Sequence, residues 1–169
     1  MIRARRASFA VVALAVLFAL TAPAHAADIG KPAPDVALTA NDGTALKLSL
    51  LRGKVVYLDF WASWCIPCRQ SFPWMGELQA RHAKDDFVVL AVNLDAQRGD
   101  ADAFLARYPA KFKVAFDASG ASARQFGVKA MPTSYVIGRD GTLLNEHRGF
   151  RDDQTTVVEA EIGVALAKK

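Results

Sequence analysis

Cysteine and histidine are scarce in this sequence, which contains only two cysteines and three histidines. A structural zinc site requires four such ligands, and His82 and His147 fall in separate segments, so zinc binding is disfavoured. The two cysteines, Cys65 and Cys68, enclose a loop of only four residues. A disulfide across so short a loop restrains the unfolded chain by about 2 kcal/mol, against about 3 kcal/mol for fifteen residues. The pair therefore indicates a chemical role rather than a structural crosslink.

The sequence also lacks a strong charge imbalance beyond its first residues. Its 21 basic and 17 acidic residues give a net charge of +4, but residues 1–26 hold three arginines and no acidic residue. Without this segment the net charge is about +1. Nucleic-acid binding, which favours strongly basic domains, is therefore not supported. No internal repeat or low-complexity linker is present, so residues 27–169 are predicted to form one domain with an adequate apolar core.

No apolar run reaches the roughly 20 residues that a membrane-spanning helix prefers. The run over residues 7–20 follows an arginine-rich start and precedes Ala24-His25-Ala26, a spacing of small residues typical of a cleavage site. This pattern predicts a secretory signal peptide over residues 1–26. The mature protein is then expected to be periplasmic or otherwise exported, and to contact a membrane only if the leader stays uncleaved as an anchor.

A continuous apolar run over residues 55–61 leads into the cysteine pair. Its lack of polar alternation predicts a strand buried on both faces, as in the centre of a parallel sheet. Residues 69–82 are predicted to form a helix that Pro73 bends without ending, and residues 87–93 repeat the apolar strand pattern. The cysteines therefore lie where a central strand gives way to a helix, within a strand-helix-strand unit.

The other segments predict strands and helices on either side of this unit. Asn41-Asp42-Gly43 indicates an N-terminal hairpin, and Asp140-Gly141 a second one. One helix is expected to place Ala103, Phe104 and Ala106 around its apolar side. The predicted segments are strands 36–39, 45–48, 114–116, 134–137 and 142–145 and helices 100–108, 121–126 and 152–166. Their order predicts an α/β fold with helices on both faces of the sheet.

Disulfide exchange requires a thiolate that attacks and a second thiol that resolves the mixed disulfide, and the Cys-x-x-Cys spacing brings both sulfurs within bonding reach. Cys65, nearer the loop, is expected to be the exposed nucleophile, and Cys68 the shielded resolving thiol. The helix N-terminus lowers the pKa of a thiol placed there. Pro67 suits the first helical turn. Because Ile66 and Pro67 offer no polar group to the thiolate, a moderate or reducing potential is favoured.

Asp59 is the one charged residue in the apolar run. A carboxylate buried among aliphatic and aromatic side chains loses its hydration, so its pKa is expected to rise. Beside the dithiol, such a group would take the proton from Cys68 as that thiol resolves the mixed disulfide. The alternative is a side chain that turns outward to solvent or bonds to a neighbouring loop.

Two stretches resemble the thioredoxin signature and its cis-proline loop: Asp59-Phe60-Trp61-Ala62 with Trp64-Cys65-Ile66-Pro67-Cys68, and Met131-Pro132-Thr133. The resemblance extends over residues 30–165 and is closer to exported TlpA/ResA-type thioredoxin-like proteins. It implies a thioredoxin fold, in which helices flank a central mixed sheet, with an N-terminal hairpin and an inserted strand-helix unit at about residues 95–117. It also implies that Pro132 is cis and lies against Cys65, and that the Met131 backbone pairs with an extended substrate segment.

Two positions depart from the pattern of these relatives. Many TlpA/ResA-type proteins carry Asn where Asp59 stands, and relatives dedicated to cytochrome c maturation often carry Glu where Thr133 stands. Trp64, Ile66 and Pro67 are expected to support the site beside the cis-proline loop, with Trp64 covering the dithiol.

The predicted function is therefore that of an exported thiol-disulfide oxidoreductase, a reductase of protein disulfides, with the Cys65–Cys68 disulfide as its redox centre and no other cofactor or metal. The expected partners are disulfide-containing exported proteins, including those of cytochrome c or copper-site maturation, and a membrane electron donor. One alternative is a copper-binding chaperone using Cys65, Cys68 and Met131, because thiolate and thioether ligands suit Cu(I). The other is a thiol oxidase.

Overall fold

A mixed sheet of seven strands runs through the part of the chain that the computed structural model describes, residues 27–168. The predicted signal peptide, residues 1–26, lies outside the described residues. The order across the sheet is β2-β1-β5-β4-β3-β6-β7, with β3, β4 and β5 parallel and the other pairs antiparallel. The strands are β1 (Ala37–Ala40), β2 (Ala45–Lys47), β3 (Val55–Trp61), β4 (Phe87–Asn93), β5 (Lys113–Phe116), β6 (Thr133–Ile137) and β7 (Leu143–Arg148).

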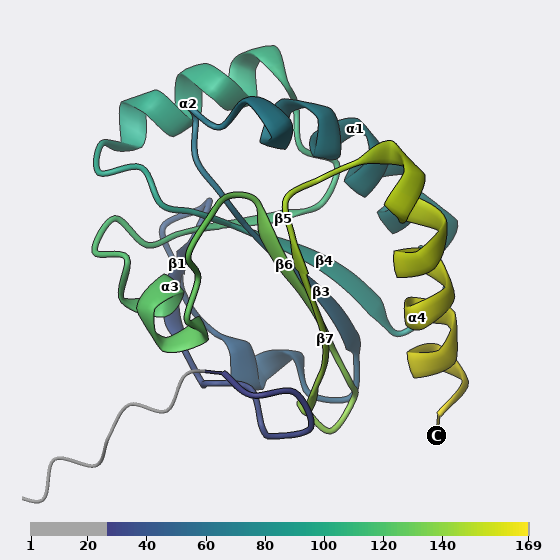
Figure 1. Cartoon of the computed structure of the whole chain (residues 1–169). Coiled ribbons are helices and arrows are strands. Elements are labelled where there is room, and N and C mark those ends of the chain that lie inside the picture. Colours follow the sequence, from purple (N-terminus) through teal and green to yellow (C-terminus); the bar gives the residue numbers. More distant parts are fainter. Residues whose placement is uncertain (1–26, 169) are drawn as a thin grey trace, which may run out of the picture.

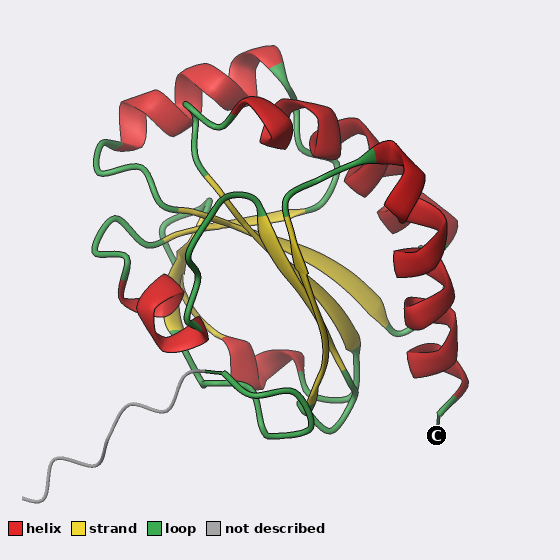
Figure 2. Ribbon diagram, viewed as in Figure 1, coloured by secondary structure: helices red, strands yellow, loops and turns green. Residues whose placement is uncertain are grey.

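Helices cover both faces of this sheet (Figures 1 and 2). One face packs against α1 (Ile66–Arg81), α2 (Arg98–Arg107) and α4 (Thr155–Ala167), and this side is called the α1/α4 face below. The other face packs against α3 (Ala121–Phe126) and the short 3₁₀ helix η1 (Leu48–Leu51). A second 3₁₀ turn, η2 (Asp152–Gln154), leads into α4. The predicted α/β architecture with two covered faces is confirmed.

Strand β3 divides its side chains between the two cores. All seven of its residues are buried, as its unbroken apolar sequence predicts. Side chains alternate along a strand, so Val55, Tyr57 and Trp61 join the core of the α1/α4 face while Val56, Leu58 and Phe60 join the opposite one. By the same alternation, Asp59 lies on the α1/α4 face, on the side of the helix that carries the cysteines.

The predicted insertion corresponds to α2 and β5. Strand β5 pairs with β4 on one side and with β1 on the other, so it joins the N-terminal hairpin to the rest of the sheet. Helix α2 packs through Phe104, whose ring centroid lies 4.7 Å from that of Trp61 and 4.9 Å from that of Phe72. The insertion therefore extends both the sheet and the core beneath α1.

Several predicted details need correction. Helix α1 begins at Ile66, three residues earlier than predicted. Pro73 does lie inside it, and the helix continues to Arg81. In α2 the buried residues are Ala101 and Phe104, whereas Ala103 and Ala106 are exposed. The large Phe104 ring packs against Trp61 and Phe72, and this contact fixes the rotation of the helix about its axis. In that rotation Ala103 and Ala106 face solvent.

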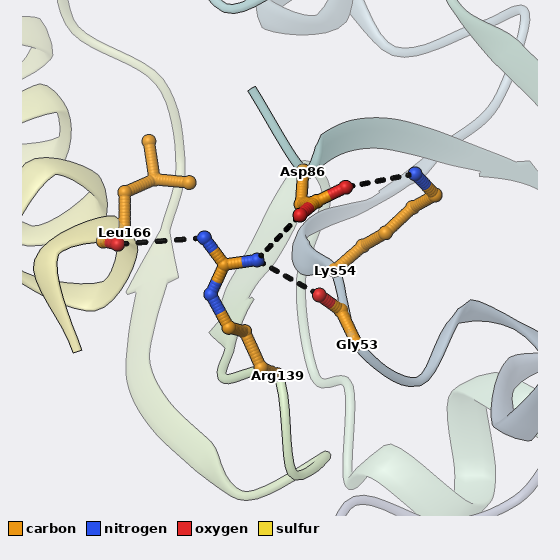
Figure 3. A network of polar contacts seen from close by, with 5 residues as sticks. All are labelled: Gly53, Lys54, Asp86, Arg139 and Leu166. Carbon is orange, nitrogen blue, oxygen red and sulfur yellow. Dashed lines mark hydrogen bonds and ion pairs between the residues drawn. The ribbon is translucent and has the colours of Figure 1, made fainter. Parts of the chain in front are cut away.

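The end of the sheet opposite the cysteines is closed by a polar network around Arg139 (Figure 3). Arg139 follows β6 and donates from Nη1 to the carbonyl oxygen of Gly53 at 2.8 Å and to Asp86 Oδ2 at 3.2 Å. Its Nη2 donates to the carbonyl oxygen of Leu166, near the end of α4, at 3.4 Å. Asp86 also pairs with Lys54 at 3.6 Å. The network thus joins the starts of β3 and β4 to the end of β6 and to α4.

Within residues 27–168, the helices are all too short or too polar to cross a membrane.

Candidate active site

The cysteine pair sits at the N-terminus of α1, immediately after β3 and a short loop. Cys65 is the N-cap residue of α1, and its Sγ accepts a hydrogen bond from the backbone N–H of Cys68 at 3.2 Å. Pro67 lies in the first helical turn, where its missing N–H leaves no bond unmade. Cys65 and Cys68 form a disulfide with their Cα atoms 5.3 Å apart. The sequence therefore placed the pair correctly, between a central strand and a helix start.

The exposure of the two cysteines differs less than predicted. Cys65 is only 3 % exposed and Cys68 is fully buried, so the expectation of an exposed Cys65 is wrong for the disulfide form. The disulfide holds the Cys65 sulfur against Cys68 instead of toward solvent. By contrast, the residues on either side of Cys65 are largely exposed to solvent, Trp64 at 65 % and Ile66 at 66 %. These two residues present apolar surface beside the disulfide.

The cis-proline loop lies at the same end of the sheet. The Met131–Pro132 peptide bond is cis, as the resemblance implied. Thr133 begins β6 and pairs with Phe60 of β3, so the loop before it stands next to the end of β3 that leads to Cys65. The Thr133 hydroxyl is buried and donates to the carbonyl oxygen of Ala130 at 2.7 Å, which fixes the loop from within. Met131 is half-buried against the core of the α1/α4 face.

Asp59 is buried beneath this site. It is 2 % exposed, and within the described residues its Oδ2 atom has no hydrogen-bond partner. Burial raises the pKa of the Asp59 carboxyl well above its usual value of 3.8. The alternative of an outward-turned side chain is therefore wrong, and the predicted rise in pKa is confirmed. An acid of this kind holds a proton at a pH where an exposed aspartate does not.

A second buried carboxylate, Asp95, was given no role by the sequence reasoning. It accepts hydrogen bonds from the Ser63 backbone N–H at 2.9 Å and from the Ser63 hydroxyl at 3.0 Å. The Asn93 side-chain amide also donates to Asp95, at 2.8 Å. Asp95 thereby anchors the loop between β3 and Cys65. The signal was present in the sequence, because the polar Asn93 ends the apolar run of β4 and Asp95 follows two residues later.

The two histidines within residues 27–168, His82 and His147, each pair with a carboxylate. His82 pairs with Asp85 and His147 with Glu161, each at 2.7 Å. Both imidazoles are about one-fifth exposed, so they are more buried than surface residues. Among the described residues, no cluster of three or more His, Cys, Asp or Glu side chains is arranged to hold a metal ion.

Comparisons with known proteins agree with this geometry. The Redoxin family model matches residues 28–162. The thiol-disulfide oxidoreductase ResA of Bacillus thuringiensis is 34 % identical over 122 residues, which cover 72 % of this chain and 70 % of the relative. The thioredoxin-like protein YneN of Bacillus subtilis is 37 % identical over 123 residues, covering 71 % of each chain. The regions that match these relatives therefore amount to most of this chain and most of each relative.

A solved structure gives the same result for the fold and the chemistry. The crystal structure of a putative thiol:disulfide interchange protein DsbE from Chlorobium tepidum has a TM-score of 0.81 and 54 % identity. The match covers 84 % of this chain and all of that one. Proteins of this kind exchange disulfides through a Cys-x-x-Cys pair rather than through a bound cofactor. The chain thus belongs to the Redoxin family and is a TlpA/ResA-type thioredoxin-like thiol-disulfide oxidoreductase.

Proposed function

We propose that the protein is an exported reductase that breaks disulfides in other exported proteins through Cys65 and Cys68. The observation that carries this proposal is the pair itself, at the N-terminus of α1, with a buried carboxyl on the same face of the sheet. The leader-like sequence of residues 1–26 supports export. The apolar Ile66-Pro67 pair between the cysteines supports a reducing rather than an oxidising potential.

The reaction begins with Cys65 as the nucleophile. In the disulfide form the backbone N–H of Cys68 donates to the Cys65 sulfur at 3.2 Å. This donor and the positive end of the helix dipole would favour the Cys65 thiolate in the reduced protein. The thiolate attacks one sulfur of the substrate disulfide, so a mixed disulfide forms and the other substrate sulfur leaves as a thiolate. The substrate is then held covalently on Cys65.

Cys68 and Asp59 complete the exchange. Cys68 transfers its thiol proton to the Asp59 carboxylate and attacks the Cys65 sulfur, so the Cys65–Cys68 bond forms and the second substrate thiolate leaves. Two electrons have passed from the dithiol to the substrate. The raised pKa of Asp59 suits this step, because a carboxylate with a higher proton affinity is a stronger base.

The substrate is proposed to bind over the exposed apolar side chains Trp64 and Ile66 and along the cis-proline loop of Met131, Pro132 and Thr133. Trp64 and Ile66 are about two-thirds exposed and flank the disulfide. Large exposed apolar side chains of this kind mark contact surfaces. An extended segment carrying its disulfide would pair with the Met131 backbone while its side chains contact the indole.

The physiological substrates are proposed to be exported proteins with oxidised cysteines, with apocytochromes and copper-site proteins as candidates. Each turnover leaves the Cys65–Cys68 pair oxidised, so an exported reductase requires a supply of electrons. A membrane protein that passes electrons outward is the proposed donor.

Insulin reduction tests the proposal directly. With dithiothreitol as reductant, the wild-type protein should accelerate insulin precipitation and Cys65→Ser should not, because this variant lacks the attacking sulfur. Full turnover by Cys65→Ser would contradict the proposed chemistry. Equilibration with glutathione tests the direction, since a reductase becomes mostly oxidised in a buffer that leaves a strong oxidant largely reduced. A pair that stays reduced there would identify a thiol oxidase instead.

A further inference from the structure

A row of polar side chains crosses the sheet from Asp59 to the rim of the molecule. Asp59 on β3 lies directly opposite Ser134 on β6, and Ser134 lies directly opposite His147 on β7. Both strand pairs are antiparallel, so the three side chains share the α1/α4 face, with neighbouring Cβ atoms about 4.5–5.5 Å apart. The row begins at the buried carboxyl of Asp59 and ends at the imidazole of His147, which is one-fifth exposed.

Hydrogen bonds link the members of the row to two further residues. The buried Tyr57 hydroxyl donates to Ser134 Oγ at 2.8 Å. Since Ser134 accepts this bond, its own hydroxyl proton remains available for a neighbouring acceptor. At the rim, His147 Nε2 and Glu161 Oε2 of α4 are 2.7 Å apart. Tyr57 does not supply a charge, because burial, with Asp59 nearby, raises the pKa of its hydroxyl far above its usual value.

A small cavity lies along the row. It measures about 10 Å³, and Tyr57, Ser134 and His147 are among the residues that line it. A volume of this order is at the lower limit for one water molecule, and the three polar side chains offer that water hydrogen-bond partners. The gap between Ser134 and the imidazole is therefore one that a single water can bridge.

The groups packed around the row come from several elements. Helix α4 adds Glu159, which accepts from Trp74 Nε1 at 2.9 Å and from Arg81 of α1 at 2.6 Å. Arg151, before η2, lines the cavity. On the other side of Asp59, β4 presents only Ala91. The charges of Glu159 and Arg81 are thus already paired. Ser134 and His147 are the polar side chains that the strand register places in line with Asp59, and Glu161 is the partner of His147.

We propose that Ser134, Tyr57, His147 and Glu161 form a proton relay that connects Asp59 to solvent during disulfide exchange. The inference rests on the proposed role of Asp59 as the base for Cys68. The Cys68 proton passes to Asp59, then through the Ser134 hydroxyl and a bridging water to His147, and from the imidazole to solvent. Glu161 orients the ring through its 2.7 Å contact with Nε2. Such a path lets Asp59 release the Cys68 proton to solvent within the same half-reaction, before the disulfide is reduced again.

The relay can be separated from a purely structural His147–Glu161 pair by following the two thiol steps individually. Reduced protein mixed with excess 5,5′-dithiobis(2-nitrobenzoate) releases one thionitrobenzoate when Cys65 attacks and a second when Cys68 resolves the mixed disulfide. Stopped-flow absorbance resolves these two phases. In His147→Gln and Ser134→Ala, the second phase should slow about tenfold, with a larger solvent deuterium isotope effect, while the first phase changes less than about twofold.

A matched control is available in the same chain. His82 is also an imidazole paired with a carboxylate at 2.7 Å, but it caps the far end of α1. His82→Gln should leave the second phase and its pH profile unchanged, whereas His147→Gln should remove an inflection from that profile. Glu161→Gln, which keeps the side-chain shape, provides a second variant if His147→Gln folds poorly. In the Asp59→Asn background, His147→Gln should produce no further slowing, because the relay acts through Asp59.

The outcomes separate the relay from the proposed function. If Asp59→Asn slows the second phase while His147→Gln, Glu161→Gln and Ser134→Ala match the wild type, the relay is refuted and the role of Asp59 stands. If Asp59→Asn also matches the wild type, the acid-base part of the proposed function fails. If the His147 and Ser134 variants slow both phases equally and lower Tm, the row has only a structural role and the relay is again refuted.

Discussion

The burial of Asp59 lowers the stability of the fold but suits the proposed role of this residue in catalysis. The carboxyl is buried in the central strand and its Oδ2 has no partner within the described residues, so its charged form loses hydration without compensation. The same burial raises its pKa and makes it a suitable proton acceptor for Cys68. A sequence selected for stability alone would place an apolar or amide residue here.

The stability effect of Asp59 should depend on pH with a defined sign. Between the ordinary pKa of 3.8 and the raised pKa of the folded state, the folded protein binds a proton that the unfolded chain has released. The free energy of unfolding therefore falls as pH rises through this window. Asp59→Asn should be more stable than the wild type by more than about 1 kcal/mol at pH 8, since one pKa unit corresponds to about 1.4 kcal/mol.

Urea denaturation of the oxidised proteins at pH 4, 6 and 8 measures this difference. The advantage of Asp59→Asn should be smallest at pH 4, near the lower end of this window, where the folded carboxyl is protonated and the unfolded one is only partly ionised. A difference that does not change with pH would mean that the carboxyl is not the titrating group.

Trp64 tests the proposed docking surface at the same scale. Trp64→Ala should lower kcat/KM for insulin by about tenfold, because burying an aromatic side chain in a contact supplies about 1–2 kcal/mol. The rate with a small disulfide such as 5,5′-dithiobis(2-nitrobenzoate) should change little, since that reagent makes few contacts beyond the sulfur. Leu50→Ala is the matched control, because Leu50 is 70 % exposed but lies on η1, which covers the other face of the sheet. Equal losses in both variants would remove the docking role.

At the scale of the element, the N-terminus of α1 should govern the reactivity of the reduced pair. With Cys65 as N-cap residue and the Cys68 N–H directed at its sulfur, the Cys65 thiol should have a pKa below the usual 8.5 or so. Reduced protein should then react with iodoacetamide faster at pH 7 than free glutathione does, and peptide mapping should find the label on Cys65. In Cys65→Ser, the buried Cys68 should react slowly. Labelling no faster than glutathione would exclude an activated thiol.

The elements themselves could largely be predicted from the sequence, for reasons that are local. The apolar runs of β3 and β4 require burial on both faces, and the 121–126 helix, α3, ends where Gly127 adopts a left-handed conformation with φ of 71°. The rotation of α2 could not be read in this way. Its only large apolar residues are the adjacent Phe104 and Leu105. Which of them faces the core depends on the shape of the core surface beneath the helix, and the sequence of the helix does not reveal that shape.

A pair of identical substitutions tests the observed rotation of α2. Ala101 is fully buried and Ala103 is exposed, although the sequence predicted Ala103 on the apolar side. Ala101→Ser should lower the free energy of unfolding by about 1–3 kcal/mol, because the hydroxyl enters an apolar core. Ala103→Ser should change it by less than about 0.5 kcal/mol. Both variants carry the same change in helix propensity, so only the environment differs, and a reversed order would show the opposite rotation.

At the scale of the whole molecule, the contacts that sequence reasoning missed join segments far apart in the chain. Ser63 and Asp95, Asp59 and Ser134, and Arg139 and Gly53 all meet only because the order and register of the strands bring them together. A motif shows which residues are chemically suited to a site, but register depends on every strand pairing between them. The burial of Asp59 could be predicted because it depends only on the apolar sequence of its own strand, β3.

Substitutions at the two ends of the sheet should therefore have different effects. Those at the cysteine end should change the rates of disulfide exchange, and those at the Arg139 end should change stability. Arg139→Met keeps an unbranched apolar stem and removes the donors to Gly53, Asp86 and Leu166. It should lower the free energy of unfolding by about 1–2 kcal/mol, because three hydrogen bonds are lost, at exposed sites for Gly53 and Asp86 and at a half-buried site for Leu166. Lys54→Met is the control, since the exposed Lys54–Asp86 pair at 3.6 Å contributes at most about 1 kcal/mol.

Neither substitution should alter the two phases of thionitrobenzoate release, because Cys65, Cys68 and Asp59 lie at or toward the opposite end of β3. Urea denaturation and stopped-flow absorbance on the same protein samples give both measurements. If Arg139→Met slows the second phase while the protein remains folded, the polar network and the dithiol are coupled through the sheet, and the separation of the two ends is wrong. If it changes neither stability nor rate, the bonds that Arg139 makes to three segments contribute no net stabilisation.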